Sequence, residues 1–250
     1  MLCRKGIALL VEWLVVLIVT FATFTQSLVG FGFALVAMPL LSVAQVPPTI
    51  STPLVALLAL SLRPLLVAHS WRFFRWRDIA PLTLSAALAV PVGIFFVQRL
   101  DQRLLVRVLG LLIVGYVLYE TLLRARLQAE DLPWGKRWAV PLGLLAGLFG
   151  GAYNIFGPPA VVYGAGRHWP SRTFRANLQV FATMMSLLTS VAHFIDGNLT
   201  PQVISLALVC VPLALLSMAL GLRLIRHLNE RVYRKLVLGL LLLSGLRLLV

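Results

Sequence analysis

The chain has 250 residues, of which 60% are hydrophobic and 12% are charged, and its mean hydropathy is +0.94. This composition excludes a water-soluble globular domain, because too little polar surface is available, and it predicts an all-α polytopic protein in a lipid bilayer. The net charge of +14 does not indicate binding to nucleic acid, because the arginines lie in short groups between apolar runs, as expected for cytoplasmic loops.

Apolar segments follow one another along the chain, five before and five after a polar stretch at 124–137. They cover residues 7–25, 31–46, 53–69, 79–97, 104–123, 138–151, 157–166, 176–195, 201–222 and 233–250. We therefore predict a single transmembrane domain over 1–250, built from halves 1–123 and 138–250 with the linker 124–137 between them.

A complete span needs about 20 mostly apolar residues, and some of these segments are shorter. Whether the second segment of each half, 31–46 or 157–166, spans fully is left open. The count is therefore eight to ten transmembrane segments, and it is eight if the first two segments of each half form one bent or re-entrant element.

The two halves show an internal repeat, because landmarks recur at a nearly constant offset. Gly93 corresponds to Gly221, and LDQRLLVR at 100–107 corresponds to LNERVYRK at 228–235, both at an offset of 128. An odd number of segments in each half turns the second copy upside down in the membrane. We predict inverted five-helix halves.

Loop charge supports this inversion. Segment 71–77 contains three arginines, whereas its counterpart 196–200 contains no lysine or arginine, so the two are expected on opposite sides of the membrane. The predicted cytoplasmic loops are 71–77, 124–137, 167–175 and 223–235. The same scheme places Arg99 and Arg103 outside, against the usual bias.

Glycine, proline and amide residues interrupt an apolar helix at equivalent positions of the two halves, at 25–39 and at 150–159. Broken helices persist in membranes where they line a cavity, and a half-helix that begins at such a break presents free N–H groups and a positive dipole end. The candidate substrate-binding residues at the breaks are Gln26, Ser27, Gly30, Gly32, Asn154, Gly157 and Pro158. The alternative interpretation is that the small residues serve close helix packing.

Four further polar residues are candidates for the same site. Thr52 and Asn177 are equivalent at an offset of 125, so they either face one cavity or cap their own helices. Arg63, inside an apolar segment, either contacts an anion or extends to the membrane interface. Arg175, at a helix entrance, is either an anion contact or a cytoplasmic anchor.

The motifs resemble a known family. QSLVGFGFALVAMPLL (26–41), GGAYNIFGPPAVVY (150–163) and FRANLQ (174–179) look like the paired signatures of the TauE/SafE sulfite exporters. The resemblance covers essentially the whole chain and implies movement of sulfite, a sulfonate, thiosulfate or a small organic acid. Asn154, Ile155, Phe156 and the double proline replace the further glycines usual there, which leaves the exact anion open.

An enzyme is not expected, because the sequence has no Walker loop, no Gly-x-Ser-x-Gly elbow and no metal-ligand spacing. We predict a secondary transporter of small anions that works by alternating access as a multi-pass protein of the inner (cytoplasmic) membrane, without cofactor or metal. Coupling to a proton or another ion stays open, as does a homodimer. The alternative is a non-transporting membrane assembly or scaffold protein.

Overall fold

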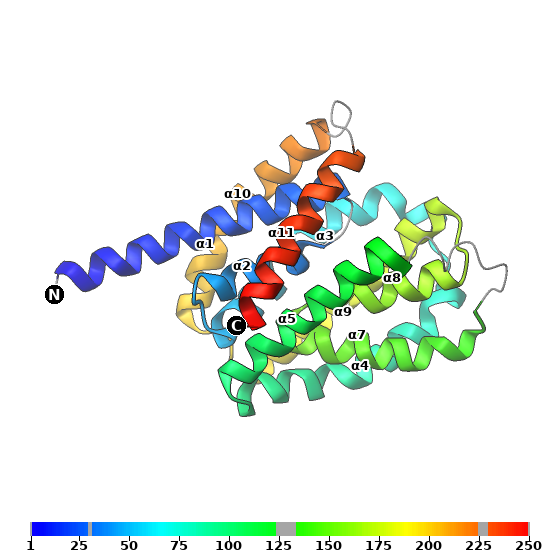
Figure 1. Ribbon diagram of the computed structural model, residues 1–250, viewed down its shortest axis with the longest axis horizontal. Coiled ribbons are helices and arrows are strands. Elements are labelled where there is room, and N and C mark those ends of the chain that lie inside the picture. Colours follow the sequence, from blue (N-terminus) through cyan, green and yellow to red (C-terminus); the bar gives the residue numbers. More distant parts are fainter. Residues whose placement is uncertain (1, 30–31, 124–133, 225–229, 250) are drawn as a thin grey trace.

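The computed structural model describes residues 2–29, 32–123, 134–224 and 230–249, and all regular structure in this part of the chain is helical (Figure 1). The α-helices are α1 Leu2–Val29, α2 Phe33–Val43, α3 Pro48–Ser70, α4 Trp76–Arg99, α5 Gln102–Leu118, α7 Ala139–Tyr153, α8 Gly157–Gly166, α9 Ser171–Ile195, α10 Pro201–Leu224 and α11 Glu230–Leu249. A π-helical turn, Tyr119–Leu123, extends α5, and short 3-10 turns occupy Trp71–Phe73 and Lys136–Trp138.

Four helices among the described residues are long and apolar enough to cross a membrane by length and composition: α4, α5 with its π-helical extension, α9 and α10. The predicted all-α polytopic membrane protein agrees with this architecture. Most of the predicted linker, residues 124–133, lies outside the described residues.

The helices pair mostly with partners from the other half of the chain. α4 packs along α7, α1 along α10, α3 against α9, and α5 against α11 (Figure 1). Each of these pairs joins segments far apart in the sequence, so the two halves share one interior.

Glycines allow α7 and α4 to approach very closely. Gly143, Gly147 and Gly151 recur every four residues on α7, and a Cβ atom on Gly147 or Gly151 would meet the backbone carbonyl of Ala86 or Val90 on α4. Small residues at this spacing let helix backbones come together in a bilayer, where packing drives association. The pair α4–α7 is therefore a close, backbone-to-backbone contact.

Helices α7 and α8 form a hairpin. α7 ends at Tyr153 and α8 begins at Gly157, and the far end of α8 returns to the beginning of α7, where the Trp134 N–H donates to the Gly166 carbonyl at 2.8 Å. At 1.5 Å per residue, the 10 residues of α8 extend about 15 Å, roughly half the hydrocarbon core. α8 by itself does not cross the membrane.

Helix α1 ends at Val29 and α2 begins at Phe33. α2 has 11 residues and begins after Gly32, whose φ of 99° lies in the left-handed region. The last turns of α1 are held by α10, because the Ser217 hydroxyl donates to the Thr20 carbonyl at 2.8 Å and Gly221 packs directly on Ser27. Like α8, α2 is too short to span by itself.

The apolar core consists of two clusters. One gathers mainly around α1, α2, α3, α5, α10 and α11 and includes Phe33 and Leu35; the other gathers around α4, α7, α8 and α9 and includes Phe156, Ala160 and Phe181. These five residues from the two clusters line one cavity, so the break regions of both halves meet where the clusters adjoin.

Candidate functional site

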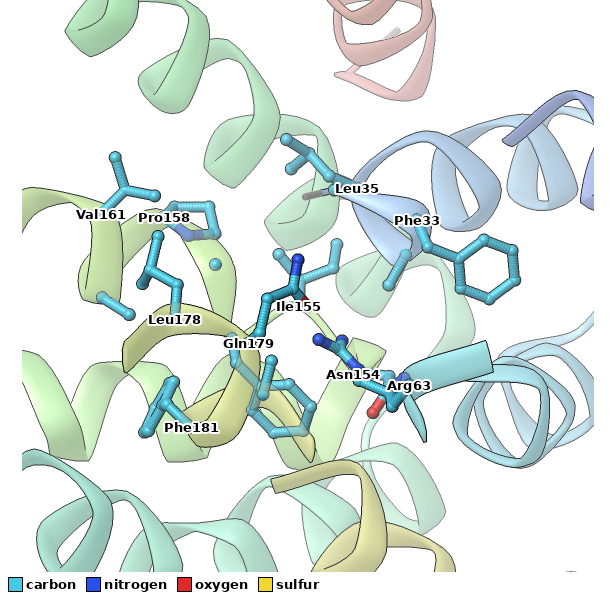
Figure 2. Close-up of a pocket in the computed structure, with 16 residues that line it drawn as sticks. Phe33, Leu35, Arg63, Asn154, Ile155, Pro158, Val161, Leu178, Gln179 and Phe181 are labelled. Carbon is cyan, nitrogen blue, oxygen red and sulfur yellow. The ribbon is translucent and has the colours of Figure 1, made fainter. Parts of the chain in front are cut away.

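A cavity of about 50 Å³ lies between the beginning of α2, the middle of α3, the break between α7 and α8, and α9 (Figure 2). Its lining residues are Gly32, Phe33, Ala34, Leu35, Arg63, Asn154, Ile155, Phe156, Gly157, Pro158, Ala160, Val161, Leu178, Gln179, Phe181 and Ala182. We call this cavity the central pocket. Apart from one cation and two amides, its side chains are apolar. A solute that enters therefore loses its hydrating water and gains only a few polar contacts with the protein.

Arg63 is the one charged side chain among these lining residues. Its Nε atom is buried and has no hydrogen-bond partner in the described structure, and Figure 2 shows the guanidinium group directed into the cavity near Asn154. A buried charge without a counter-charge is costly. An anion bound beside Arg63 would offset that cost and would accept hydrogen bonds from the guanidinium group.

Asn154 forms the turn that ends α7. Its φ of 56° lies in the left-handed region, which asparagine adopts more readily than most residues. The side-chain Nδ2 donates to the Val55 carbonyl on α3 at 3.4 Å, while Oδ1 is buried without a partner. Asn154 therefore links the break to α3 and retains a polar atom that a ligand or water can use.

Both short helices present their N-terminal ends to the central pocket. Neither α2 nor α8 has a side chain that caps these first N–H groups. Pro158 and Pro159 lack an N–H group, so α8 offers mainly its dipole and the Gly157 N–H, whereas α2 offers the free N–H groups of a first turn. Both ends favour negative charge in the cavity.

Five predicted site residues from the two halves of the chain line the central pocket. They are Gly32, Arg63, Asn154, Gly157 and Pro158. Gly30 lies outside the described residues. The cavity therefore combines the break residues of both halves with a cation from α3.

Two predicted residues of the first break are buried elsewhere. The Ser27 hydroxyl donates to the Phe24 carbonyl at 2.6 Å and lies against Gly221 of α10. Gln26 is buried on α1, and like Ser27 it does not line the central pocket. This part of α1 therefore packs against a neighbouring helix, as in the alternative interpretation of the small residues at the breaks.

The remaining three predicted residues also lie away from this lining. The Thr52 hydroxyl donates to the Ala152 carbonyl at 3.0 Å, connecting α3 to the end of α7. The Asn177 Oδ1 accepts the backbone N–H of Arg75 at 3.0 Å, just before α4 begins. Arg175 is exposed near the start of α9.

Sequence reasoning did not select Gln179, although its side chain lines the central pocket from α9. Figure 2 shows it extending toward the same space as Arg63. The available signal was a second amide within an apolar helix, two residues after Asn177. Because residues two apart on a helix face different directions, the two amides meet different partners.

Helices of membrane-spanning character around a small cavity lined by one cation are the arrangement expected of a membrane transport protein. The family model described as "Sulfite exporter TauE/SafE" matches residues 15–248. The chain therefore belongs to the TauE/SafE family, whose members are transporters and not enzymes. The resemblance inferred from the motifs is confirmed.

Two curated relatives are similar over most of their length. One, from Cupriavidus necator, is named "Probable sulfite/organosulfonate exporter TauE" and is 23% identical over 226 residues, which cover 89% of this chain and 88% of the relative. The other, from Comamonas testosteroni, is named "Probable inner membrane transporter protein TsaS" and is 27% identical over 181 residues, which cover 72% of this chain and 74% of the relative. No solved structure matches the chain.

Proposed function

We propose that this protein is a secondary transporter that moves a small oxyanion, sulfite or a small organosulfonate, across the inner membrane through the central pocket. The observation that carries the proposal is Arg63, a cation whose Nε is buried and unpartnered in a cavity that also receives the N-terminal ends of α2 and α8. A singly or doubly charged oxyanion is the complementary ligand, because it accepts hydrogen bonds from guanidinium and from backbone N–H groups.

The size of the cavity favours an anion with few atoms. A cavity needs about 10–15 Å³ of this volume for each water molecule, so about 50 Å³ accommodates a few water-sized groups. Sulfite fits this volume better than larger sulfonates do, and thiosulfate or a small carboxylate fits similarly. The name of the Cupriavidus necator relative includes both sulfite and organosulfonate, which supports the same substrate class.

We further propose that the halves are inverted repeats that exchange access between the two membrane sides without ATP. The helix pairs support this: the fourth helix of the first half, α4, packs on α7, and its counterpart α10 packs on α1. Gly93 and Gly221, equivalent in the two halves, each lie at one of these contacts. Such paired, broken repeats are typical of secondary transporters.

The inner membrane is the proposed location. The Comamonas testosteroni relative is named as an inner membrane transporter, and the four candidate spans agree with a multi-pass protein. A scaffold protein would explain the helices, but it gives no role to an arginine that lines a cavity with a buried, unpartnered Nε atom.

The experiment is a flux screen with purified protein in liposomes, using sulfite, thiosulfate, small sulfonates and small carboxylates. We expect saturable flux of at least one sulfur oxyanion. Gly157→Leu should abolish it by filling the central pocket, whereas Gly115→Leu, at a position where an added Cβ meets no atom within 4 Å, should retain it. Absence of flux for all these anions would favour the scaffold, and flux that does not saturate would favour a channel.

A further inference from the structure

A second and larger cavity, of about 620 Å³, opens at one end of the helix bundle. It lies where α2 ends, α5 begins and α11 ends, and three arginines line it: Arg103 and Arg107 from α5, and Arg247 from α11. We call it the arginine pocket. Val106 and Leu248 contribute apolar surface beside these cations.

The three guanidinium groups outnumber the acidic side chains of the lining, which include one aspartate, Asp101. All three arginines are exposed, and within the described part of the chain no carboxylate forms an ion pair with them. Asp101 is the acidic residue of the lining, and its Oδ1 already accepts the Arg103 backbone N–H at 3.3 Å. The lining therefore has an excess of positive charge.

This concentration of like charge is unfavourable by itself. Arg103 and Arg107 are four residues apart on α5, so their side chains share a face of the helix and repel each other. Arg247 approaches the same space from a different helix. A ligand with several oxygen acceptors would relieve the repulsion, because guanidinium groups bind oxyanions through paired N–H donors.

The usual bias of loop charge does not explain these arginines. α4 runs for 24 residues from Trp76 to Arg99, about 36 Å at 1.5 Å per residue, and the arginine pocket lies just beyond its end. The opposite end of α4 adjoins the arginine-rich segment 71–77, which we predict to be cytoplasmic. The arginine pocket is then on the external side, where the bias for cytoplasmic arginine does not apply.

We propose that the arginine pocket is a second anion-binding site, separate from the central pocket, for a phosphate- or sulfonate-type oxyanion. The ligand is either the head group of an anionic lipid or a free anion in solution. The shared chemistry is a tetrahedral or pyramidal group of oxygens held by Arg103, Arg107 and Arg247. A lipid would additionally place its chains beside Val106 and Leu248, as in basic pockets between transmembrane helices.

The test measures binding to the full-length protein in an uncharged detergent. The thermal unfolding midpoint is followed against sodium sulfate at constant ionic strength and, separately, against phosphatidylglycerol, with phosphatidylcholine as the uncharged control lipid. The site variant combines Arg103→Gln, Arg107→Gln and Arg247→Gln. A matched control removes three exposed arginines from the other end of the bundle: Arg72→Gln, Arg77→Gln and Arg175→Gln.

We expect at least one probe to raise the unfolding midpoint of the wild type, with half-saturation about tenfold weaker in the site variant and within twofold of wild type in the control. If sulfate gives this dependence, the site takes free anions; if phosphatidylglycerol alone gives it, the ligand is a lipid head group. The proposal is overturned if neither probe distinguishes the site variant from the control.

Two additional variants separate the result from binding in the central pocket and from a failure of the triple variant to fold. Arg63→Gln alters the central pocket alone, so a midpoint shift that persists in it and is weakened by the site variant belongs to the arginine pocket, even if the protein transports no sulfur oxyanion. Arg247→Gln alone, on a different helix from the other two cations, is used if the triple variant does not fold. An unchanged half-saturation in this single variant would then count against the proposal.

Discussion

Asn154 combines a backbone requirement and a side-chain requirement in one residue. The left-handed φ of 56° turns the chain between α7 and α8, and the side-chain amide connects this turn to the Val55 carbonyl of α3. Glycine adopts the left-handed conformation readily but has no side-chain amide to reach α3. Alanine satisfies neither requirement.

We predict that Asn154→Gly and Asn154→Ala both reduce anion flux, since both remove the amide from the central pocket. Asn154→Ala should also be less stable than Asn154→Gly by about 1 kcal/mol, the cost of a Cβ atom in a left-handed conformation. Flux in liposomes and thermal unfolding in detergent measure the two effects. Full flux in Asn154→Gly would show that the amide has no part in transport.

Asn177 is expected to act in the structure and not in transport. Its Oδ1 accepts the Arg75 N–H at 3.0 Å, so Asn177→Ala should destabilise the protein by about 1 kcal/mol through the lost acceptor. Flux for each folded molecule should remain at the wild-type level. A variant with normal unfolding and lost flux would instead place Asn177 on the substrate path.

The contact between α4 and α7 depends on glycines, which have no side chain. A Cβ atom on Gly147 meets the Ala86 carbonyl, whereas one on Gly115 of α5 meets no atom within 4 Å. We predict that Gly147→Ala lowers stability by about 1–3 kcal/mol through overpacking. Gly115→Ala should be neutral or stabilising by up to about 1 kcal/mol, because alanine favours helix. Thermal unfolding of both variants provides the comparison, and equal midpoints would contradict the close contact.

The helices themselves could be predicted well from the sequence, because apolar runs bounded by polar loops are long and clear in a membrane protein. The segment predicted at 157–166 coincides with α8, and the one at 201–222 with α10, Pro201–Leu224. α9 begins at Ser171, five residues before the apolar run at 176, because helical hydrogen bonding continues into the polar interface. Composition alone does not mark that boundary.

The faces of the helices could not be predicted in the same way. α7 is apolar on all sides, so no hydrophobic period indicates which residues meet α4 and which meet the cavity. Ser27 adjoins a predicted break, but its side chain packs against Gly221 of α10. The sequence pattern did not indicate this direction either. Arg63 and Asn154 were recognisable because a charge or an amide in an apolar helix needs a special environment.

The distribution of positive charge among the loops predicts how the protein is oriented in the membrane. The segment around Phe73 is rich in arginine and 196–200 has none. Helices α4 and α9 run parallel, because Arg75 bonds to Asn177 near their starts and Gln98 bonds to Asp196 near their ends, so the two segments lie at opposite ends of these spans. We predict that, in a background without Cys3 and Cys210, Phe73→Cys reacts only with reagents that reach the cytoplasm. Asn198→Cys should react from outside. Labelling of both from one side would exclude this topology and, with it, the inverted repeat.

We propose that the protein moves a small oxyanion past Arg63. Arg63 lines the central pocket, whereas Arg175 is exposed at the start of α9. Comparing substitutions at these two positions therefore tests a cation in the site against a cation outside it. Loss of a charge-assisted hydrogen bond costs about 1.5–3 kcal/mol, roughly a tenfold to hundredfold change in binding.

The most direct measurement is therefore sulfite flux into liposomes at low substrate concentration for wild type, Arg63→Gln and Arg175→Gln, with equal amounts of folded protein. We predict that Arg63→Gln lowers the flux about tenfold or more and that Arg175→Gln leaves it near the wild-type rate. Wild-type flux in Arg63→Gln, or an equal loss in both variants, would contradict the assignment of the central pocket as the anion site.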